Sequence, residues 1–190
     1  MNRIVILASG SGTLAQAIFD ARADFDFLGD IVAVICDKPG APVLAKAEAA
    51  HIESFTIPML PDRKEWDREL ETLIAALRPD LVVSAGFMRI LSERITKKFK
   101  IINSHPALLP LFPGAHAVRD ALAAGATETG TTIHWVDAGV DTGEVIAQAR
   151  LAIEPGDTEE SLHERIKILE RGLIVATIKK LLPTLESNNG

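Results

Sequence analysis

The stretch IINSHPALLP, residues 101–110, indicates how the rest of this chain is organised. Two apolar residues lead directly into Asn103 and His105, and prolines follow, so the stretch predicts a buried strand that ends in a loop. Because side chains alternate along a strand, Asn103 and His105 share one face and Ser104 points to the other. An amide and an imidazole at a strand end can hold a developing oxyanion and move a proton. Taken alone, the pattern also fits a capped strand end with a hydrogen-bonded structural histidine.

Strand and helix patterns alternate before this stretch. Apolar runs predict buried strands at residues 3–8, 31–36, 54–57 and 81–85. Helical patterns separate them at residues 14–23, 41–50, 62–77 and 92–99, with Asp62 and Ser92 as the expected N-caps. The alternation predicts an α/β fold with a doubly wound, mainly parallel sheet.

The pattern changes after the stretch. A proline-rich loop leads to a helix near residues 117–124, and two β-rich runs, 127–135 and 144–153, flank a loop that contains Asp141. Such a pair predicts an antiparallel extension of the sheet in the C-terminal third. A loop aspartate is ordinarily a turn former, so Asp141 by itself carries no function.

A final helix is predicted from an N-cap at Asp157 to about Leu182. Glu170 lies between Ile166 and Leu173 on the apolar side of this helix, where an unpaired carboxylate is unfavourable. We therefore expect Glu170 to have a partner, either a protein cation or a ligand amine.

Composition bounds the class of protein. With 190 residues and 47% hydrophobic content, the chain predicts a single domain, 1–190, with a flexible tail at residues 186–190. No apolar run is long enough to span a bilayer, and the N-terminus lacks a signal-peptide pattern, so a soluble, cytoplasmic protein is expected. The single cysteine, Cys36, excludes an internal disulfide and a cysteine-based zinc site. The net charge of −6, without a Lys/Arg-rich run, argues against nucleic-acid binding.

A glycine-containing turn, residues 9–13, follows the first predicted strand and precedes the first helix. Such a turn offers backbone N–H groups and the positive end of a helix dipole to an anion, so it predicts a phosphate site. The spacing of Gly10, Gly12 and Ala15, with Asp37 at the end of the second strand, also fits a dinucleotide fingerprint. The turn contains no Gly-Lys-Ser/Thr, which excludes a Walker A loop.

Several motifs together resemble those of the phosphoribosylglycinamide formyltransferase family. They occur in that family's order across essentially the whole chain: SGSG (9–12), AGFMRIL (85–91), NSHPALLP (103–110), FPG (112–114), VDTG (140–143) and EPGDT (154–158). The resemblance implies a Rossmann-like formyltransferase fold. It also implies transfer of a formyl group from the co-substrate 10-formyltetrahydrofolate to the amine of glycinamide ribonucleotide in purine biosynthesis, with no metal. The expected partners are small molecules, with no membrane or nucleic acid, and a homodimer is left open.

The resemblance also implies roles for individual residues. The family's catalytic amide, imidazole and carboxylate fall on Asn103, His105 and Asp141. The residues implied to bind the ribonucleotide are Gly10, Ser11, Gly12, Thr13, Leu14 and Glu170. Those implied to bind the folate are Arg63, Met88, Arg89, Ile90, Leu91, Asn103, Val140 and Asp141. A carboxylate at Asp141 would favour the protonated form of His105 and relay a proton.

The chain departs from the family's pattern at two places. Many members have Ser-Asn where this chain has Thr13-Leu14, so phosphate binding is expected to depend more on backbone N–H groups. Ser104 replaces a residue that is commonly apolar, and by strand alternation it is expected to face away from the site.

Other functions fit parts of this pattern less well. Formyltetrahydrofolate hydrolase and methionyl-tRNA formyltransferase share the three catalytic positions, but each carries a further domain for which 190 residues are expected to leave no room. A dinucleotide-binding protein is favoured only by the glycine turn and Asp37. A zinc site of His105, His116, His134 and Asp141 lacks a compact ligand spacing, and His134 is expected to be a structural histidine. A Ser-His hydrolase is disfavoured because Ser104 and His105 point to opposite faces.

Overall fold

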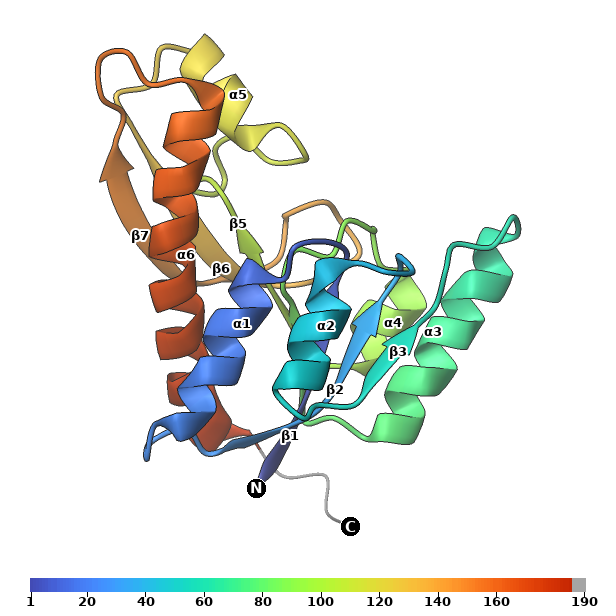
Figure 1. Ribbon diagram of the computed structural model, residues 1–190. Helices are drawn as coiled ribbons and strands as arrows, with labels where there is room; N and C mark the ends of the chain where they lie inside the picture. The colour runs from blue at the N-terminus through green and yellow to red at the C-terminus, as the bar shows by residue number, and fades with distance from the viewer. Residues whose placement is uncertain (186–190) are drawn as a thin grey trace.

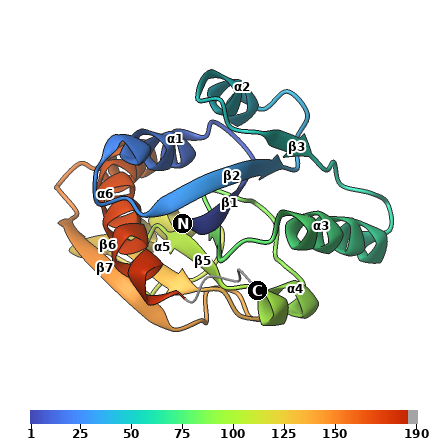
Figure 2. The ribbon, with the colours of Figure 1, turned by 90° about the horizontal axis from the view of Figure 1, so that it is seen from below.

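The computed structural model describes residues 1–185, and this part of the chain forms one sheet with helices on both faces (Figures 1 and 2). The predicted tail at residues 186–190 lies outside the described residues. The seven strands of the described sheet have the order β3-β2-β1-β4-β5-β6-β7. Their bounds are β1 (Asn2–Ala8), β2 (Gly29–Cys36), β3 (Ser54–Thr56), β4 (Leu81–Ser84), β5 (Ile101–His105), β6 (Glu128–Trp135) and β7 (Val145–Ala152).

The sheet is parallel from β3 to β5, whereas β6 and β7 are antiparallel to their neighbours. Both parts of the predicted architecture, the doubly wound parallel sheet and the antiparallel extension in the C-terminal third, are therefore confirmed. The parallel strands β1, β2 and β4 are largely buried because helices cover both faces of the sheet, whereas the short edge strand β3 is partly exposed.

The helices are α1 (Thr13–Asp20), α2 (Pro42–Ala49), α3 (Arg63–Leu77), α4 (Glu93–Lys98), α5 (Ala117–Ala123) and α6 (Glu159–Leu181). Short 3-10 turns follow α1 at Ala21–Ala23 and α6 at Leu182–Thr184. Strand alternation in β1 separates the two cores. Ile4 and Ile6 pack with α1, α2 and α6, whereas Val5 and Leu7 pack with α3 and α4. Figure 2 shows these two groups of helices on opposite sides of the sheet.

One of the two N-cap predictions for α3 and α6 agrees with the structure. The Asp62 side chain accepts from the N–H groups of Lys64 and Glu65, as predicted for α3. The prediction of Asp157 as the N-cap of α6 is wrong. Thr158 is the N-cap and forms a reciprocal capping box with Ser161. Asp157 instead accepts hydrogen bonds from the Glu154 N–H and the Ser161 hydroxyl.

The loops after β1, β4 and β5 meet at the carboxyl ends of the parallel strands, the usual place for ligands in such a sheet. The loop between β6 and β7 closes over the same end (Figure 1). Among the described helices, none combines the length and the apolar character needed to cross a membrane.

Candidate active site

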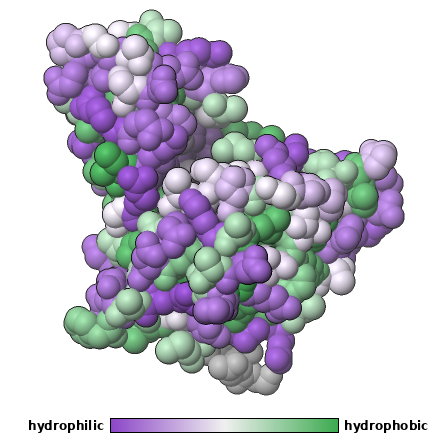
Figure 3. Space-filling model, in the orientation of Figure 1, coloured by the Kyte–Doolittle hydropathy of each residue, from purple (hydrophilic) through white to green (hydrophobic). Residues whose placement is uncertain are grey.

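A cavity of about 530 Å³ lies at the carboxyl ends of the parallel strands. Its lining comes from the turn after β1, the loop after β4, the end of β5, the loop between β6 and β7, and α6. Figure 3 shows the molecule hollowed between the part that carries α5 and the main body. Of the residues implied to act, all but Arg63 line this cavity: Gly10, Ser11, Gly12, Thr13, Leu14, Met88, Arg89, Ile90, Leu91, Asn103, His105, Val140, Asp141 and Glu170.

Strand β5 delivers Asn103 and His105 to the cavity. His105 is 4% exposed, and its Nε2 lies 2.8 Å from the carbonyl oxygen of Phe112. A carbonyl oxygen can only accept, so Nε2 carries a proton. Phe112 has φ +52°, an uncommon conformation for a bulky residue, and this turn directs its carbonyl at the imidazole.

Asp141 meets the other side of the imidazole. Its Oδ2 lies 3.3 Å from His105 Nδ1 and accepts from the Gly114 N–H at 2.8 Å. Burial disfavours the carboxylate, but a hydrogen bond from His134, the Gly114 N–H and the charges of the two histidines outweigh it, so the pKa of Asp141 lies below its usual value. Asp141 is therefore ionised at neutral pH.

The two partners of His105 are both acceptors. The Phe112 carbonyl lies at one ring nitrogen and the ionised Asp141 at the other. A neutral imidazole carries one N–H and satisfies only one of them, whereas the imidazolium donates to both. Both ring nitrogens of His105 thus face acceptors, an arrangement that suits a general acid.

His134 is a cavity residue whose position the sequence did not reveal. Its Nδ1 faces the Trp135 carbonyl at 2.8 Å, so that nitrogen carries a proton. Its Nε2 lies 3.3 Å from Asn103 Nδ2 and 3.5 Å from Asp141 Oδ1. It is a hydrogen-bonded histidine, as expected, and it also contacts two of the three predicted catalytic residues. The signal that would have found it is the antiparallel pairing of Asn103 with His134.

The glycine turn lies beside this group. Gly12 has φ +70° and occupies the N-cap position of α1, where no side chain caps the helix. The first N–H groups of α1 therefore lack a side-chain acceptor, as suits an anion site. A Cβ on Gly12 would lie 2.6 Å from a methyl carbon of Val43, so the close packing of this turn against α2 requires glycine.

The loop after β4, residues 86–91, is tied to its neighbours on several sides. The Met88 N–H donates to Ser9 Oγ at 2.8 Å, and Arg89 Nε donates to Asp37 Oδ2 at 2.6 Å. Arg63, the one residue implied to act that is outside the cavity lining, donates to the Ile90 carbonyl and lies over the Trp66 ring. The Asp37 side chain is fully buried, its Oδ2 is paired with Arg89, and it is not part of the cavity lining, so the structure gives no support for a ribose contact at Asp37.

Glu170 has a partner within the protein, and it is a hydroxyl group instead of the expected cation. Its Oε1 accepts from the hydroxyl of Ser104 at 2.7 Å. The alternative of a ligand amine stays a prediction. The expectation that Ser104 faces away from the site is wrong. The alternation along β5 holds, but the cavity extends past the end of the strand on both faces, so Ser104 lines it too. His163 and Lys167 of α6 complete this side of the lining, and the sequence reading had missed both.

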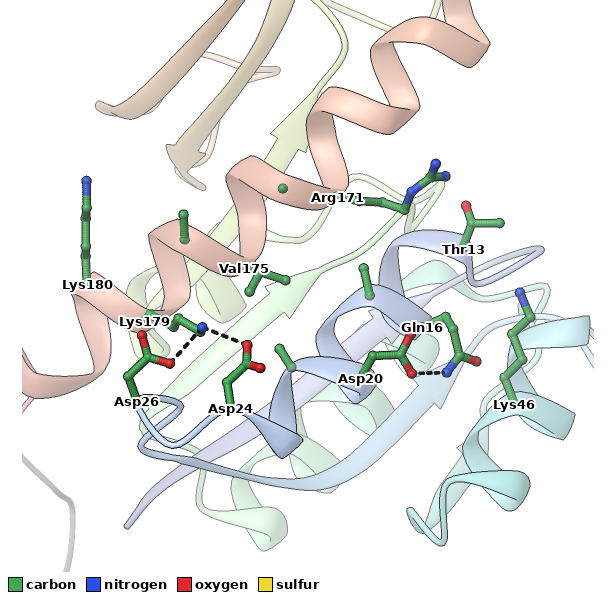
Figure 4. A pocket seen from close by; sticks show the side chains of 14 residues that line it. Thr13, Gln16, Asp20, Asp24, Asp26, Lys46, Arg171, Val175, Lys179 and Lys180 are labelled. Carbon is green, nitrogen blue, oxygen red and sulfur yellow. Dashed lines mark hydrogen bonds and ion pairs between the residues drawn. The ribbon is translucent and has the colours of Figure 1, made fainter.

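A second hollow, of about 1000 Å³, lies between α1 and α6 (Figure 4). It is larger, but its Lys179 is held by Asp24 and Asp26, each at 2.7 Å, and Asp20 accepts from Gln16. Thr13 is its only residue among those implied to act. We therefore take the smaller cavity as the candidate active site. Within residues 1–185, no group of three or more His, Cys, Asp or Glu is arranged to hold a metal ion.

The chain was compared with known proteins. A family model described as "Formyl transferase" matches residues 2–178. Phosphoribosylglycinamide formyltransferase of Mycobacterium tuberculosis (strain CDC 1551 / Oshkosh) is 47% identical over 183 residues, covering 94% of this chain and 84% of the relative. The enzyme of the same name from Bacillus subtilis is 37% identical, covering 96% and 95%. The crystal structure of glycinamide ribonucleotide transformylase 1 from Geobacillus kaustophilus has a TM-score of 0.91 at 38% identity, covering 96% and 99%. This chain therefore belongs to the formyl transferase family.

Proposed function

We propose that this chain transfers the formyl group of 10-formyltetrahydrofolate to the amine of glycinamide ribonucleotide, giving formylglycinamide ribonucleotide and tetrahydrofolate. The observation that carries the proposal is the position of Asn103, His105 and the ionised Asp141 together in one cavity, with Asp141 3.3 Å from the imidazole. The names of the relatives, reported above, agree with this reaction.

The chemistry follows from charge development. The ribonucleotide amine attacks the formyl carbon, and negative charge grows on the formyl oxygen. The Asn103 amide and the His105 Nε2–H are the donors proposed to meet this charge. In the structure the Phe112 carbonyl accepts a hydrogen bond from His105 Nε2, so a formyl oxygen that accepts from this nitrogen replaces Phe112 as its partner.

Proton transfer completes the step. The attacking amine must lose a proton, and N10 of the folate must gain one before its bond to the formyl carbon breaks. Asp141 accepts a proton and His105 donates one, and the two groups are in contact, so the proton lost by the amine can return to the leaving nitrogen. These proposed reaction steps do not require a metal ion.

The two substrates are assigned to different segments of the cavity lining. The ribonucleotide phosphate is proposed to bind at residues 10–14, with backbone N–H groups of α1 and with the Lys167 cation in the same lining. The folate is proposed to bind along residues 88–91, mainly through backbone groups, because the Arg89 side chain is already paired with Asp37.

The test is formyl transfer by the purified chain from 10-formyltetrahydrofolate, with glycinamide ribonucleotide, water alone or initiator methionyl-tRNA as the acceptor. Mass spectrometry of the acceptor identifies the product. We expect formylglycinamide ribonucleotide and no folate turnover without the ribonucleotide. Release of formate at the same rate in water alone would make the chain a hydrolase, and a formylated tRNA would make it a tRNA formyltransferase.

A further inference from the structure

Ser104 lies between Asn103 and His105 in β5 but on the other face of the strand. Its hydroxyl donates to Glu170 Oε1 at 2.7 Å and lies 3.2 Å from the hydroxyl of Thr131 on β6. Three elements, β5, β6 and α6, therefore meet at this group of side chains. Ser104 and Glu170 both line the cavity.

The direction of these hydrogen bonds is fixed by the number of hydrogens. A hydroxyl has one hydrogen, and an ionised carboxylate only accepts, so the Ser104 hydrogen goes to Glu170. The Thr131 hydroxyl has three acceptors within reach: Ser104 Oγ, the carbonyl of His105, which lies 3.1 Å away, and the Glu170 carboxylate. Ser104, on β5, thus donates a hydrogen bond that fixes the orientation of the Glu170 carboxylate. The backbone of Glu170 is held in α6.

The carboxylate is in an unfavourable position without this donor. Glu170 is 9% exposed, and burial raises its pKa, against which hydrogen bonds with Ser104 and Thr131 and the charges of Lys167 and Arg171 act. Lys167 and Arg171 belong to α6 itself, whereas β5 and β6 present hydroxyl groups. Lys167 is also paired with Glu164. The Ser104 hydroxyl is therefore the main neighbour that favours the charged form.

We infer that Ser104 is a positioning residue, which holds the Glu170 carboxylate in the orientation that accepts hydrogen bonds from the glycinamide and ribose part of the ribonucleotide. The inference deepens the proposed function and rests on it. It gives β5 two tasks: one face presents the groups for formyl transfer, and the other presents the hydroxyl that orients the acceptor-side carboxylate.

The test uses a matched pair of variants at one position. Ser104→Thr keeps the hydroxyl group. Ser104→Val introduces a side chain of the same shape as threonine but without the hydroxyl. We expect Ser104→Val to raise the Kd and KM for glycinamide ribonucleotide about tenfold, as for a lost hydrogen bond to a charged group. Ser104→Thr stays close to the unaltered chain, and the Kd for a folate analogue changes less than twofold in both variants.

A second readout separates positioning from general damage. NMR titration of a ¹³C-labelled Glu170 carboxyl group measures the effect directly. We expect this group to keep its proton to higher pH in Ser104→Val than in Ser104→Thr, because Ser104→Val lacks the donor that favours the charged form. The ribonucleotide KM of Ser104→Val should worsen at mildly acidic pH more than that of Ser104→Thr. If the extra methyl prevents folding of both variants, Ser104→Ala provides the same comparison with the unaltered chain.

The outcomes are distinguishable. If the unaltered chain formylates glycinamide ribonucleotide but the Thr and Val variants bind it equally well, the inference is wrong and the proposed function stands. Glu170→Gln with unchanged ribonucleotide affinity overturns the inference in the same way. Absence of formyl transfer by the unaltered chain overturns the proposed function, and this inference with it.

Discussion

Two loops line the same cavity and are held in different ways. The loop after β4, residues 86–91, is tied to other elements through Met88, Arg89 and the Ile90 carbonyl, and it buries Phe87 and Leu91. The loop between β6 and β7, residues 137–143, is organised mainly within itself. Asp137 Oδ1 accepts from the Gly139 N–H at 3.0 Å and from the Thr142 hydroxyl at 2.7 Å.

The second loop reaches the centre of the cavity through one side chain. Asp141, at φ +55°, projects its carboxylate to His105 and to the Gly114 N–H. The first loop therefore presents a backbone whose shape is fixed from several sides, whereas the second presents a charge. Side-chain changes in the first loop should therefore have small effects on ligand binding, and loss of a single charge in the second should have a large effect on turnover.

The largest effect is expected for Asp141→Asn. Asparagine tolerates the positive φ and keeps the size of the side chain, so the change removes mainly the charge. Turnover should fall by about 10²–10⁴-fold, the usual contribution of a positioned acid or base, with a smaller change in ribonucleotide affinity. Steady-state turnover and the ribonucleotide Kd, measured for both proteins, give the two effects separately.

Asp137→Asn is the matched control in the same loop, since its amide oxygen can still accept from Gly139 and Thr142. The double variant His105→Ala with Asp141→Asn should be scarcely worse than the worse single variant, because the two act as a unit. Similar turnover in Asp141→Asn and Asp137→Asn would show that Asp141 has only a structural role in its turn. The proposed difference between the two loops would then be wrong.

The glycine turn extends the comparison to a third segment. Gly12 is a poor probe, because a Cβ there would collide with Val43 and damage the fold. Gly10 lines the cavity, and among the described residues no atom lies within 4 Å of a Cβ built on it. Gly10→Ala should weaken ribonucleotide binding about tenfold, equivalent to 1.4 kcal/mol, without lowering the melting temperature. Calorimetric titration measures the ribonucleotide Kd, with Ser11→Ala as the control. If both substitutions change this Kd equally and only slightly, the phosphate does not bind at this turn.

A smaller effect on ligand binding is expected for Arg89→Ala. The folate Kd should rise only a few-fold, because the loop keeps its contacts to Ser9 and Arg63. Stability should fall by about 1–3 kcal/mol, because the buried Asp37 loses its partner. Adding Asp37→Asn should recover part of that stability in urea unfolding. A folate Kd raised a hundredfold would show that the arginine side chain itself binds the ligand.

The smallest effect concerns acid stability. The pKa of Asp141 is below its usual value of 3.8, so the folded state favours the carboxylate. The resulting stability is fully present above that value and is lost as the pH falls through the lowered pKa. The unaltered chain should therefore lose more stability than Asp141→Asn between neutral pH and pH values below 3.8. Urea unfolding at several pH values measures the free energy of unfolding of both proteins. If the difference between them is the same at every pH, the lowered pKa of Asp141 is contradicted.

Much of this molecule was predictable from local patterns. Apolar runs located the strands, and the alternation of strand and helix predicted the parallel sheet, because each pattern reflects the burial of its own element. The family motifs pointed to Asn103, His105 and Asp141, and the structure brings all three to one cavity. Which ligand each cavity residue binds stays a prediction.

The features that were missed depend on relations between elements. Strand alternation gave the correct face for Ser104 but not the extent of the cavity on that face. The position of His134 depends on the register between β5 and β6, which pairs it with Asn103. The choice of Thr158 over Asp157 as a cap depends on the reciprocal bond from Ser161, and both residues suit the N-cap by type.

The antiparallel pairing of β5 with β6 also bears on how this chain tolerates insertions and deletions. The register sets Asn103 opposite His134 and His105 opposite Thr132. A slip of one residue would turn every side chain of β6 to the other face and withdraw His134 from Asn103. In a library of single-residue deletions, formyl transfer should therefore fall across residues 129–135 by more than the cellular abundance of the protein falls. Deletions in the short edge strand β3 should change activity and abundance together.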